Sequence, residues 1–419
     1  MVKMKLVNKI SNWVSSSQER KTLIANFSYL SILQLAGYIF PLMTMPYLAR
    51  VIGAEGFGRI AFAHAVIVWI QTIAEWGFNF TATRDVAQNR DDKKIVSEIL
   101  SKVICARLLL AILSFLILCV LIITIPIFRS NAAIILITYL AVPSSILFPD
   151  WFFQAIEKMK YTTIFNLAIK FIFTILVFLF IKDKQDYIYQ PLLTVVGYLM
   201  CGLTALFVIF YKWKYKFILP NYHIVLMTIK TGTNVFLNNL VPNLYNSFST
   251  LLLTMYGGPI ANGIYDGGNK FAFIFSNLQS VISRTFFPFL SRRSDKHSVF
   301  VKINITISLL ASLFLFTCAP LIVEIMLGNE FIDSVAVLRV LSLSIFFLAL
   351  NDTYGTNYLI IKNHERELRN ITIVSSIIGF LVAFPLVKYY TYIGAALTIF
   401  ISRFLLGVLT YLQYRFLIK

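Results

Sequence analysis

The sequence predicts an all-α integral membrane protein with twelve transmembrane helices, and three observations support this prediction. Apolar residues make up 58% of the 419 positions, so the hydropathy belongs to the whole chain. Apolar runs of about twenty residues recur, and a helix of that length crosses the ~30 Å hydrocarbon core of a bilayer. Lipid offers no hydrogen bonds to a bare backbone, so each run must be helical. Lys and Arg, finally, concentrate in alternate loops.

The apolar runs follow one another along the chain with short loops between them. We expect spans at roughly 23–50, 59–83, 99–125, 131–156, 161–181, 189–211, 224–256, 264–290, 299–323, 334–361, 370–388 and 392–414. With this assignment 24 Lys and Arg lie in the loops of one side and 6 in those of the other. Such a bias in short loops predicts a multi-pass membrane protein with both termini in the cytoplasm.

The domain organisation follows from the spans. Residues 1–21 carry apolar side chains on one helical face and are too polar for a signal peptide, so we expect a cytoplasmic interfacial helix. Residues 22–211 then form an N-terminal six-helix bundle, 212–223 a cytoplasmic linker and 224–419 a C-terminal six-helix bundle.

Several functional classes are disfavoured. The net charge of +18 is dispersed in short loops beside the membrane, where anionic lipid attracts it, and no basic stripe interleaved with aromatics suggests nucleic acid. The four cysteines lie inside apolar spans without metal or redox spacing. No phosphate loop, HExxH or nucleophile elbow is present, so we expect no cofactor, no metal site and no enzyme.

The two halves share a pattern. Residues 53–58 (GAEGFG) connect the first two spans, and residues 257–263 (GGPIANG) connect the seventh and eighth. Each turn is expected to be an outside connection of about ten residues, and each following span ends in a basic stretch. The halves are therefore interpreted as parallel repeats of six spans, a common construction of alternating-access transporters.

Polar residues form stripes on the first two spans of each half, since successive helical residues turn by 100°. Gln34, Tyr38 and Pro41 share a face of span 1. The other stripes are His64, Gln71, Glu75 and Asn79 on span 2, Asn239, Asn243, Asn246, Thr250 and Thr254 on span 7, and Asp266, Lys270, Asn277 and Arg284 on span 8. We expect these stripes to line one cavity for a polar, negatively charged cargo. The alternative is structural: Asp266 pairs with Lys270, and the asparagines join helices.

Three blocks resemble a known family. They are 52–63 (IGAEGFGRIAFA) with 75–84 (EWGFNFTATR), 150–161 (DWFFQAIEKMKY) followed by Lys170, and 263–270 (GIYDGGNK) followed by Phe287, Pro288, Ser291 and Arg292. Over nearly its whole length the chain resembles the O-antigen flippases of the Wzx type. These are polysaccharide transporters of the multidrug/oligosaccharidyl-lipid/polysaccharide exporter superfamily. It departs from their pattern at Gly267 and Gly268, where a small residue and alanine are usual, and at Ala155, where glycine is usual. The resemblance implies that the protein lies in a bacterial inner membrane.

The resemblance implies a V of two pseudo-symmetric six-helix bundles around a cationic cavity, and an alternating-access mechanism. It also implies translocation of undecaprenyl-diphosphate-linked oligosaccharide repeat units, of O-antigen or a similar surface polysaccharide, from the cytoplasmic to the periplasmic leaflet. Membrane lipids, and a polysaccharide polymerase with its chain-length machinery, are the partners this implies. Two other functions stay open: a multidrug cation antiporter of the same fold, which needs buried carboxylates, and a surface-polysaccharide polymerase, which needs a large periplasmic loop.

Individual residues receive roles on this basis. Lys270 is expected to hold the diphosphate, with Arg50, Arg59 or Arg84 assisting at the ends of the cavity, although Arg50 and Arg59 could equally reach lipid headgroups. Asp150 and Lys170 join the candidate cavity residues through the family blocks. Glu75 is either a proton carrier or a static partner of a basic residue on a facing helix.

Overall fold

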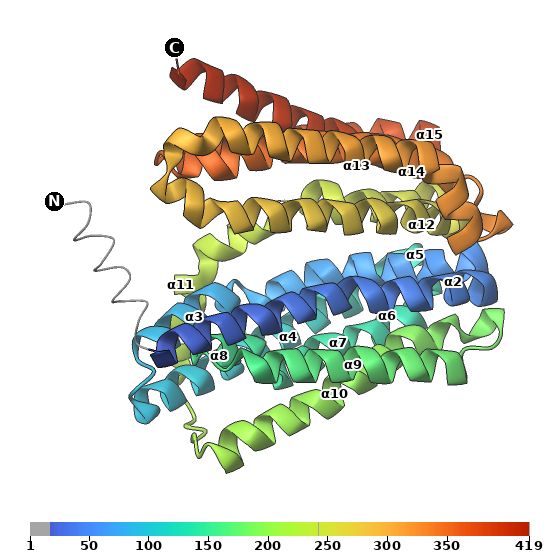
Figure 1. Ribbon diagram of the computed structural model, residues 1–419. Helices are drawn as coiled ribbons and strands as arrows, with labels where there is room; N and C mark the ends of the chain where they lie inside the picture. The colour runs from blue at the N-terminus through green and yellow to red at the C-terminus, as the bar shows by residue number, and fades with distance from the viewer. Residues whose placement is uncertain (1–16, 242, 419) are drawn as a thin grey trace.

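The computed structural model describes residues 17–241 and 243–418, and every regular element in these ranges is a helix (Figure 1). The predicted interfacial helix at 1–21 lies outside them, except that residues 17–21 begin the first described helix. The elements of the first half are α2 Ser17–Glu75, α3 Phe78–Gln88, α4 Lys93–Thr124, α5 Pro126–Ser130, α6 Ala132–Tyr139, α7 Ala141–Leu147, α8 Asp150–Ala155, α9 Met159–Phe180, η1 Lys184–Ile188, α10 Tyr189–Phe207 and η2 Val208–Lys212.

The second half begins after an irregular segment. Its elements are α11 Tyr222–Leu240, α12 Asn243–Arg292, η3 Ser294–Lys296, α13 His297–Met326, η4 Asn329–Phe331, α14 Ser334–Leu350, η5 Asn351–Ile360 and α15 Glu365–Ile418. Two of the short elements, η2 and η5, are π-helical and continue α10 and α14. Polar side chains start several helices: the Asp92 carboxylate caps α4 by accepting from the backbone N–H groups of Lys94 and Ile95.

Eight segments of the described chain are long and apolar enough to cross a membrane, which confirms a multi-pass protein. Two of them, Ile32–Gln88 with 57 residues and Glu365–Leu417 with 53, are more than twice as long as one crossing needs. Each contains a residue outside the helical region, Gly53 in α2 and Thr391 in α15. In Figure 1 the α2 ribbon reverses its direction and runs back beside its first part.

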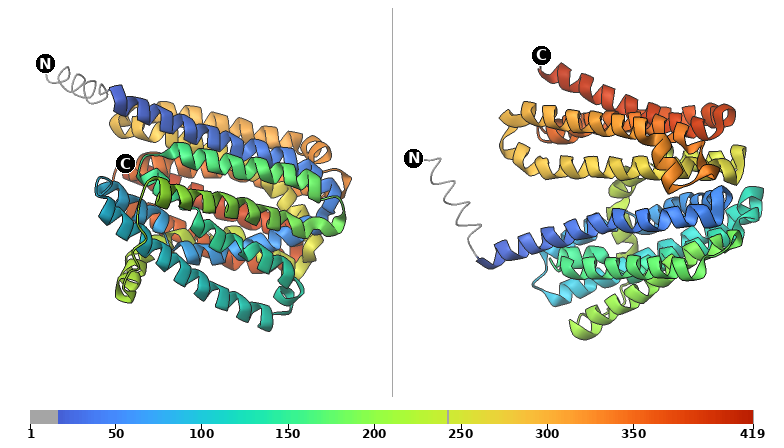
Figure 2. Two further views of the ribbon diagram at one scale, coloured as in Figure 1. Left: turned by 90° about the horizontal axis from the view of Figure 1, so that it is seen from below. Right: turned by 45° about the vertical axis from the view of Figure 1, so that its right-hand side comes forward.

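The helices of the two halves form two adjacent groups. Figure 1 and the right-hand view of Figure 2 show α2–α10 on one side and α12–α15 on the other, with α11 crossing between them. The largest buried apolar cluster includes side chains of both groups, among them Ile52 of α2 and Leu253 of α12. The halves are therefore joined by packing as well as by the chain.

The second predicted span is interrupted by a left-handed turn. Trp76 (φ 44°) and Gly77 (φ 77°) separate α2 from α3, so the helix expected over 59–83 ends at Glu75 and a new one begins at Phe78. Tertiary contacts hold Trp76 in this unfavourable conformation. Its ring stacks on Phe236 of α11 at 3.9 Å, and its Nε1–H donates to the Ile229 carbonyl at 3.0 Å.

The two glycine turns have the same backbone conformation. Gly53 has φ 65° and ψ −176°, and Gly258 has φ 74° and ψ −177°, a region open in practice only to glycine. The expectation of ten-residue connections at both places is wrong, because helix resumes directly after each glycine. One glycine is enough to reverse each helix, and the matching angles agree with the predicted repeat.

The two turns also touch each other. A Cβ atom at Gly58 would lie 1.7 Å from the Pro259 carbonyl oxygen, and one at Gly263 would lie 1.9 Å from that of Ala54. The buried Asn262 amide adds a hydrogen bond across the contact by donating to the Gly58 carbonyl at 3.0 Å. Backbone therefore meets backbone where α2 and α12 reverse, and the halves are closed at that end.

We predict that Gly58→Ala lowers the melting temperature of the detergent-purified protein more than Gly258→Ala does. Alanine at 58 collides with backbone atoms that cannot rotate away, whereas alanine at 258 meets no atom within 4 Å and suffers only backbone strain, on the order of 1–3 kcal/mol. Thermal unfolding monitored by intrinsic fluorescence measures both. Equal melting temperatures for Gly58→Ala and the parent would show that the turns are not in contact.

Candidate functional site: a cavity between the halves

A cavity of about 540 Å³ lies between the two groups of helices. Its walls come from α2, α9, α10 and α12, so both halves contribute. Its polar lining residues are Gln34, Tyr38, Thr44, Lys170, Gln190, Lys270 and Asn277, and apolar residues such as Phe57 and Phe273 complete the walls. Of the predicted candidates it brings together Lys170, Lys270 and Asn277, along with the Gln34–Tyr38–Pro41 face of the first span.

Lys270 is the best-defined cation of the cavity. Its Nζ atom forms an ion pair with the Asp266 carboxylate at 2.7 Å, one helical turn away, and lies 4.2 Å from the centre of the Phe57 ring. The side chain of Lys270 is 41% exposed, whereas that of Asp266 is 20% exposed and does not line the cavity. The pair predicted as the structural alternative is thus present, and within it the ammonium group faces the open space.

Lys170 lines the cavity from α9, in the other half of the chain. Its Nζ atom lies near Gly37 of α2, where an added Cβ would be only 3.3 Å away. In the described part of the chain no carboxylate lies within ion-pair distance of Lys170. The neighbouring polar groups are neutral: the Gln34 amide donates to the Tyr38 hydroxyl at 2.7 Å. Glycine at 37 makes the room that this lysine occupies.

The stripe of span 2 is divided between α2, with His64, Gln71 and Glu75, and α3, with Asn79, and none of these residues lines the cavity. The Glu75 carboxylate accepts from the Gln71 amide at 2.8 Å and from the Asn79 amide at 3.3 Å. Both bonds join residues one turn apart, so the three side chains form a continuous polar strip. His64 belongs to α2 and is exposed, and it interacts electrostatically with Asp266 and Lys270 of α12.

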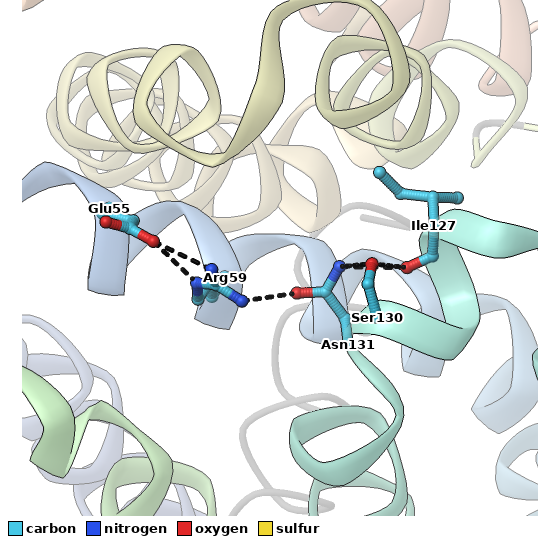
Figure 3. A network of polar contacts seen from close by, with 5 residues as sticks. All are labelled: Glu55, Arg59, Ile127, Ser130 and Asn131. Carbon is cyan, nitrogen blue, oxygen red and sulfur yellow. Dashed lines mark hydrogen bonds and ion pairs between the residues drawn. The ribbon is translucent and has the colours of Figure 1, made fainter.

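Arg50 and Arg59 are engaged at the closed end. The Arg50 guanidinium donates to the Ile325 carbonyl of α13 at 2.9 Å. Arg59 pairs with Glu55 at 2.8 Å and donates to the Asn131 side-chain oxygen at 3.3 Å. The Asn131 amide nitrogen in turn donates to the Ile127 carbonyl (Figure 3). Neither arginine lines the cavity, and both connect α2 to neighbouring helices.

The remaining candidates lie outside the cavity. Arg84 pairs with Asp85 at 2.9 Å, and an Asp150 oxygen accepts from the Trp151 backbone N–H at 2.7 Å. The Asn243 amide donates to the Thr72 hydroxyl at 3.1 Å and so joins the halves, as the structural alternative for the asparagines expects. Asn246 is half-buried and Arg284 is exposed, whereas the side chain of Asn239 lies outside the described residues.

Two residues at or near the site were not predicted from the sequence, Gln190 and Arg107. Gln190 lines the cavity from α10. It could not be predicted, because a single amide at the beginning of an apolar run forms no polar stripe. Arg107 of α4 is 3% exposed and interacts electrostatically with both Glu75 and Asp150. A lone arginine within an apolar span was the available signal, because such a charge needs an internal partner. Arg107 is a candidate for the basic partner that Glu75 was expected to have.

The lining of the cavity is cationic. Both ionisable groups on its walls are ammonium groups, and the one acid in ion-pair contact with them, within the described residues, is Asp266. Amide and hydroxyl groups of Gln34, Tyr38 and Asn277 add neutral hydrogen-bonding capacity. Such a space can hold an anionic group that also carries hydroxyls.

Comparison with known proteins agrees with this architecture. The model of the family described as "Polysaccharide biosynthesis protein" matches residues 23–294. A protein of Escherichia coli (strain K12) named "Putative O-antigen transporter" is 28% identical over 89% of this chain and 92% of its own length. One of the same name from Shigella dysenteriae is 26% identical over 91% and 97%.

Solved structures share the fold. An inward-facing multidrug resistance MATE family transporter of the MOP superfamily has a TM-score of 0.68 and 15% identity, over 94% of this chain and 98% of that one. The lipid II flippase MurJ in an inward closed conformation has a TM-score of 0.68 and 14% identity, over 94% and 87%. The chain is thus an all-helical membrane protein with the fold of MOP-superfamily transporters, and it belongs to the polysaccharide biosynthesis protein family.

Proposed function

We propose that the chain is a flippase, and not an enzyme, that moves undecaprenyl-diphosphate-linked oligosaccharide repeat units from the cytoplasmic to the periplasmic leaflet. The observation that carries the proposal is the cavity between the halves, which is lined by Lys170 from one half and Lys270 from the other. Family membership and the names of the two bacterial relatives support a cargo that belongs to surface polysaccharide synthesis.

The chemistry of the cavity fits such a cargo. Stripping one hydroxyl of its hydrogen bonds costs about 4–8 kcal/mol in an alkane-like medium, so a sugar chain cannot cross lipid unaided. Amide and hydroxyl groups on the wall would replace water around the sugars, and the two ammonium groups would hold the diphosphate. Lys170, which has no described carboxylate partner, would gain a counter-ion when cargo binds.

We also propose how often the chain crosses the membrane and in which orientation. Reversals at Gly53, Gly258 and Thr391 divide α2, α12 and α15. Counting the two arms of each gives twelve crossings in two six-helix bundles, 22–211 and 224–419, joined by the linker 212–223. Contact between the two glycine turns closes one end, and the charge sorting places this end outside. Both termini would then be cytoplasmic, and the cavity would open inward.

The rival functions fit less well. A multidrug cation antiporter needs a carboxylate free to receive a cationic drug, whereas the acid nearest the cavity, Asp266, is already paired with Lys270. A polymerase needs a large catalytic loop, and the connections between the described helices are short. A polysaccharide polymerase and its chain-length machinery remain proposed partners of the flippase.

We predict that Lys270→Ala abolishes complementation of a flippase-null strain and slows flipping in liposomes at least about tenfold, because one phosphate contact in a partly buried site is lost. Asp266→Asn should retain more activity, since it removes the partner and keeps the ammonium group. Lys302→Ala, at an exposed position of α13, is the matched control. Equal loss in Lys270→Ala and Asp266→Asn would mean that the pair is only structural.

A second prediction concerns the driving force. A diphosphate linker carries about two negative charges, so an inside-negative potential of 100 mV favours its outward movement by about 4–5 kcal/mol. In proteoliposomes, flipping of fluorescent lipid-linked oligosaccharide should accelerate when a potassium diffusion potential makes the cargo-loaded side negative. A flipping rate that is the same with and without the potential would contradict this driving force.

The third prediction concerns Glu75, for which we propose proton exchange. Glu75→Gln mimics the protonated acid while keeping the shape of the strip with Gln71 and Asn79. Any acceleration of flipping by an imposed pH gradient should disappear in this variant, and acceleration by the electrical potential should remain. If the variant keeps both the rate and the pH dependence of the parent, Glu75 is a static partner of Arg107.

A further inference from the structure

A second, smaller pocket lies at the end of the N-terminal half that carries the α3–α4 and α8–α9 connections. Its volume is about 220 Å³, and four lysines and two aromatic residues line it: Lys93, Lys158, Lys212, Trp213, Lys214 and Tyr215. They come from three separate connections: the start of α4, the loop before α9 and the segment after η2. The pocket thus gathers four positive charges from distant parts of the chain at the end that the charge sorting assigns to the cytoplasm.

The pocket has a rigid base. Trp213 packs edge-on against Phe153 at 5.7 Å and Tyr161 at 5.0 Å, and Tyr215 packs against Phe152 at 5.2 Å. The chain beyond is tied to α4, since the Lys216 and Ile218 backbone N–H groups donate to the hydroxyls of Ser97 and Ser101 at 3.1 and 2.9 Å. Fixed aromatic rings therefore hold the backbone from which the lysines project.

The charges of the pocket are not neutralised. In the part of the chain that the structure describes, no ion pair joins any of the four lysines to a carboxylate. Lys158 lies 4.0 Å from the centre of the Trp213 ring, and the Lys93 ammonium donates to the Trp213 carbonyl at 3.4 Å. Burial, and then the charges of Lys93 and Lys212, lower the pKa of Lys158. A bound anion would relieve this repulsion.

The surroundings indicate what kind of anion fits. Tyr211, next to Lys212 in the chain, is 77% exposed and stacks on the exposed Phe207 at 5.3 Å. Leu219, at the other end of the segment, is 81% exposed. Apolar side chains of this size beside a lysine cluster are suited to the boundary between headgroups and acyl chains. An anionic group attached to an apolar tail matches both features, whereas free phosphate matches only the lysines.

We propose that this pocket binds the phosphate of an anionic phospholipid of the inner leaflet, with the acyl chains lying along Phe207 and Tyr211. The site is separate from the cavity of Lys170 and Lys270, and it rests on the proposed orientation but not on the identity of the cargo. Because Lys212 and Lys214 open the linker between the halves, a lipid held there would fix the N-terminal end of that linker to the membrane surface.

The test measures lipid binding to the full-length protein in detergent. We expect dioctanoyl phosphatidylglycerol to bind at least about tenfold more tightly than dioctanoyl phosphatidylcholine, whose choline cation the lysines repel. Replacing Lys93, Lys158, Lys212 and Lys214 together by Gln should remove this preference. The matched control replaces four other lysines by Gln, Lys182, Lys184, Lys302 and Lys388, and it should bind like the parent.

Three results would overturn the proposal. The first is an unchanged preference in the pocket variant, provided that its melting temperature without lipid equals that of the parent. The second is inorganic phosphate competing as strongly as phosphatidylglycerol, which would make the pocket a general anion site. The third is undecaprenyl diphosphate displacing phosphatidylglycerol at equal concentration, which would assign the pocket to cargo. Loss of flipping with intact phosphatidylglycerol binding would bear only on the proposed function.

Discussion

The two halves are held together at one end by the direct approach of backbone to backbone between residues 54–58 and 259–263. Helices that carry side chains at the point of contact pack 8–10 Å apart, and only glycine allows a closer approach. Here the carbonyls of Ala54 and Pro259 occupy the space that Cβ atoms at Gly263 and Gly58 would need. Asn262, fully buried, adds a hydrogen bond across the contact.

This contact determines where open space can exist. With the halves joined at the glycine turns, α2 and α12 are held together at one end, and the cavity that contains Lys170 and Lys270 lies along the same two helices and α9. The contact continues into apolar packing, because Phe57 of α2 and Ala261 and Ile264 of α12 belong to the largest buried apolar cluster. Separation of the halves at this end would therefore expose apolar surface of that cluster.

Charges inside the helical body fall into two groups. Some are satisfied by protein: Arg403 donates to the hydroxyls of Ser276 and Ser344, and Arg59 is held by Glu55 and Asn131. Others line the cavity: Lys170, which has no carboxylate partner among the described residues, and Lys270, which is paired with Asp266. The first group holds helices together, and the second is available to a ligand.

The sequence alone was sufficient for the class of protein. Apolar length and loop charges predicted a helical membrane protein, because lipid imposes helix on every crossing and these signals are local. The polysaccharide transporter family was predicted from the resemblance of three sequence blocks. A helical wheel also predicted which polar residues of one span share a face, as Gln34 and Tyr38 do, because it relates residues of a single helix.

Only the tertiary structure decided which stripes share the cavity. Whether Arg59 meets cargo or Asn131 depends on the distance between α2 and the α5–α6 turn, and no pattern within one helix contains that distance. The lysine pocket shows the same limit, because Lys93, Lys158 and Lys212 look like ordinary loop charges until folding brings three connections together. The break at Trp76 and Gly77 likewise needs packing against Phe236 of α11 to be stable. The periodicity of the sequence shows which residues share one face of a helix, whereas long-range packing decides which helix faces meet.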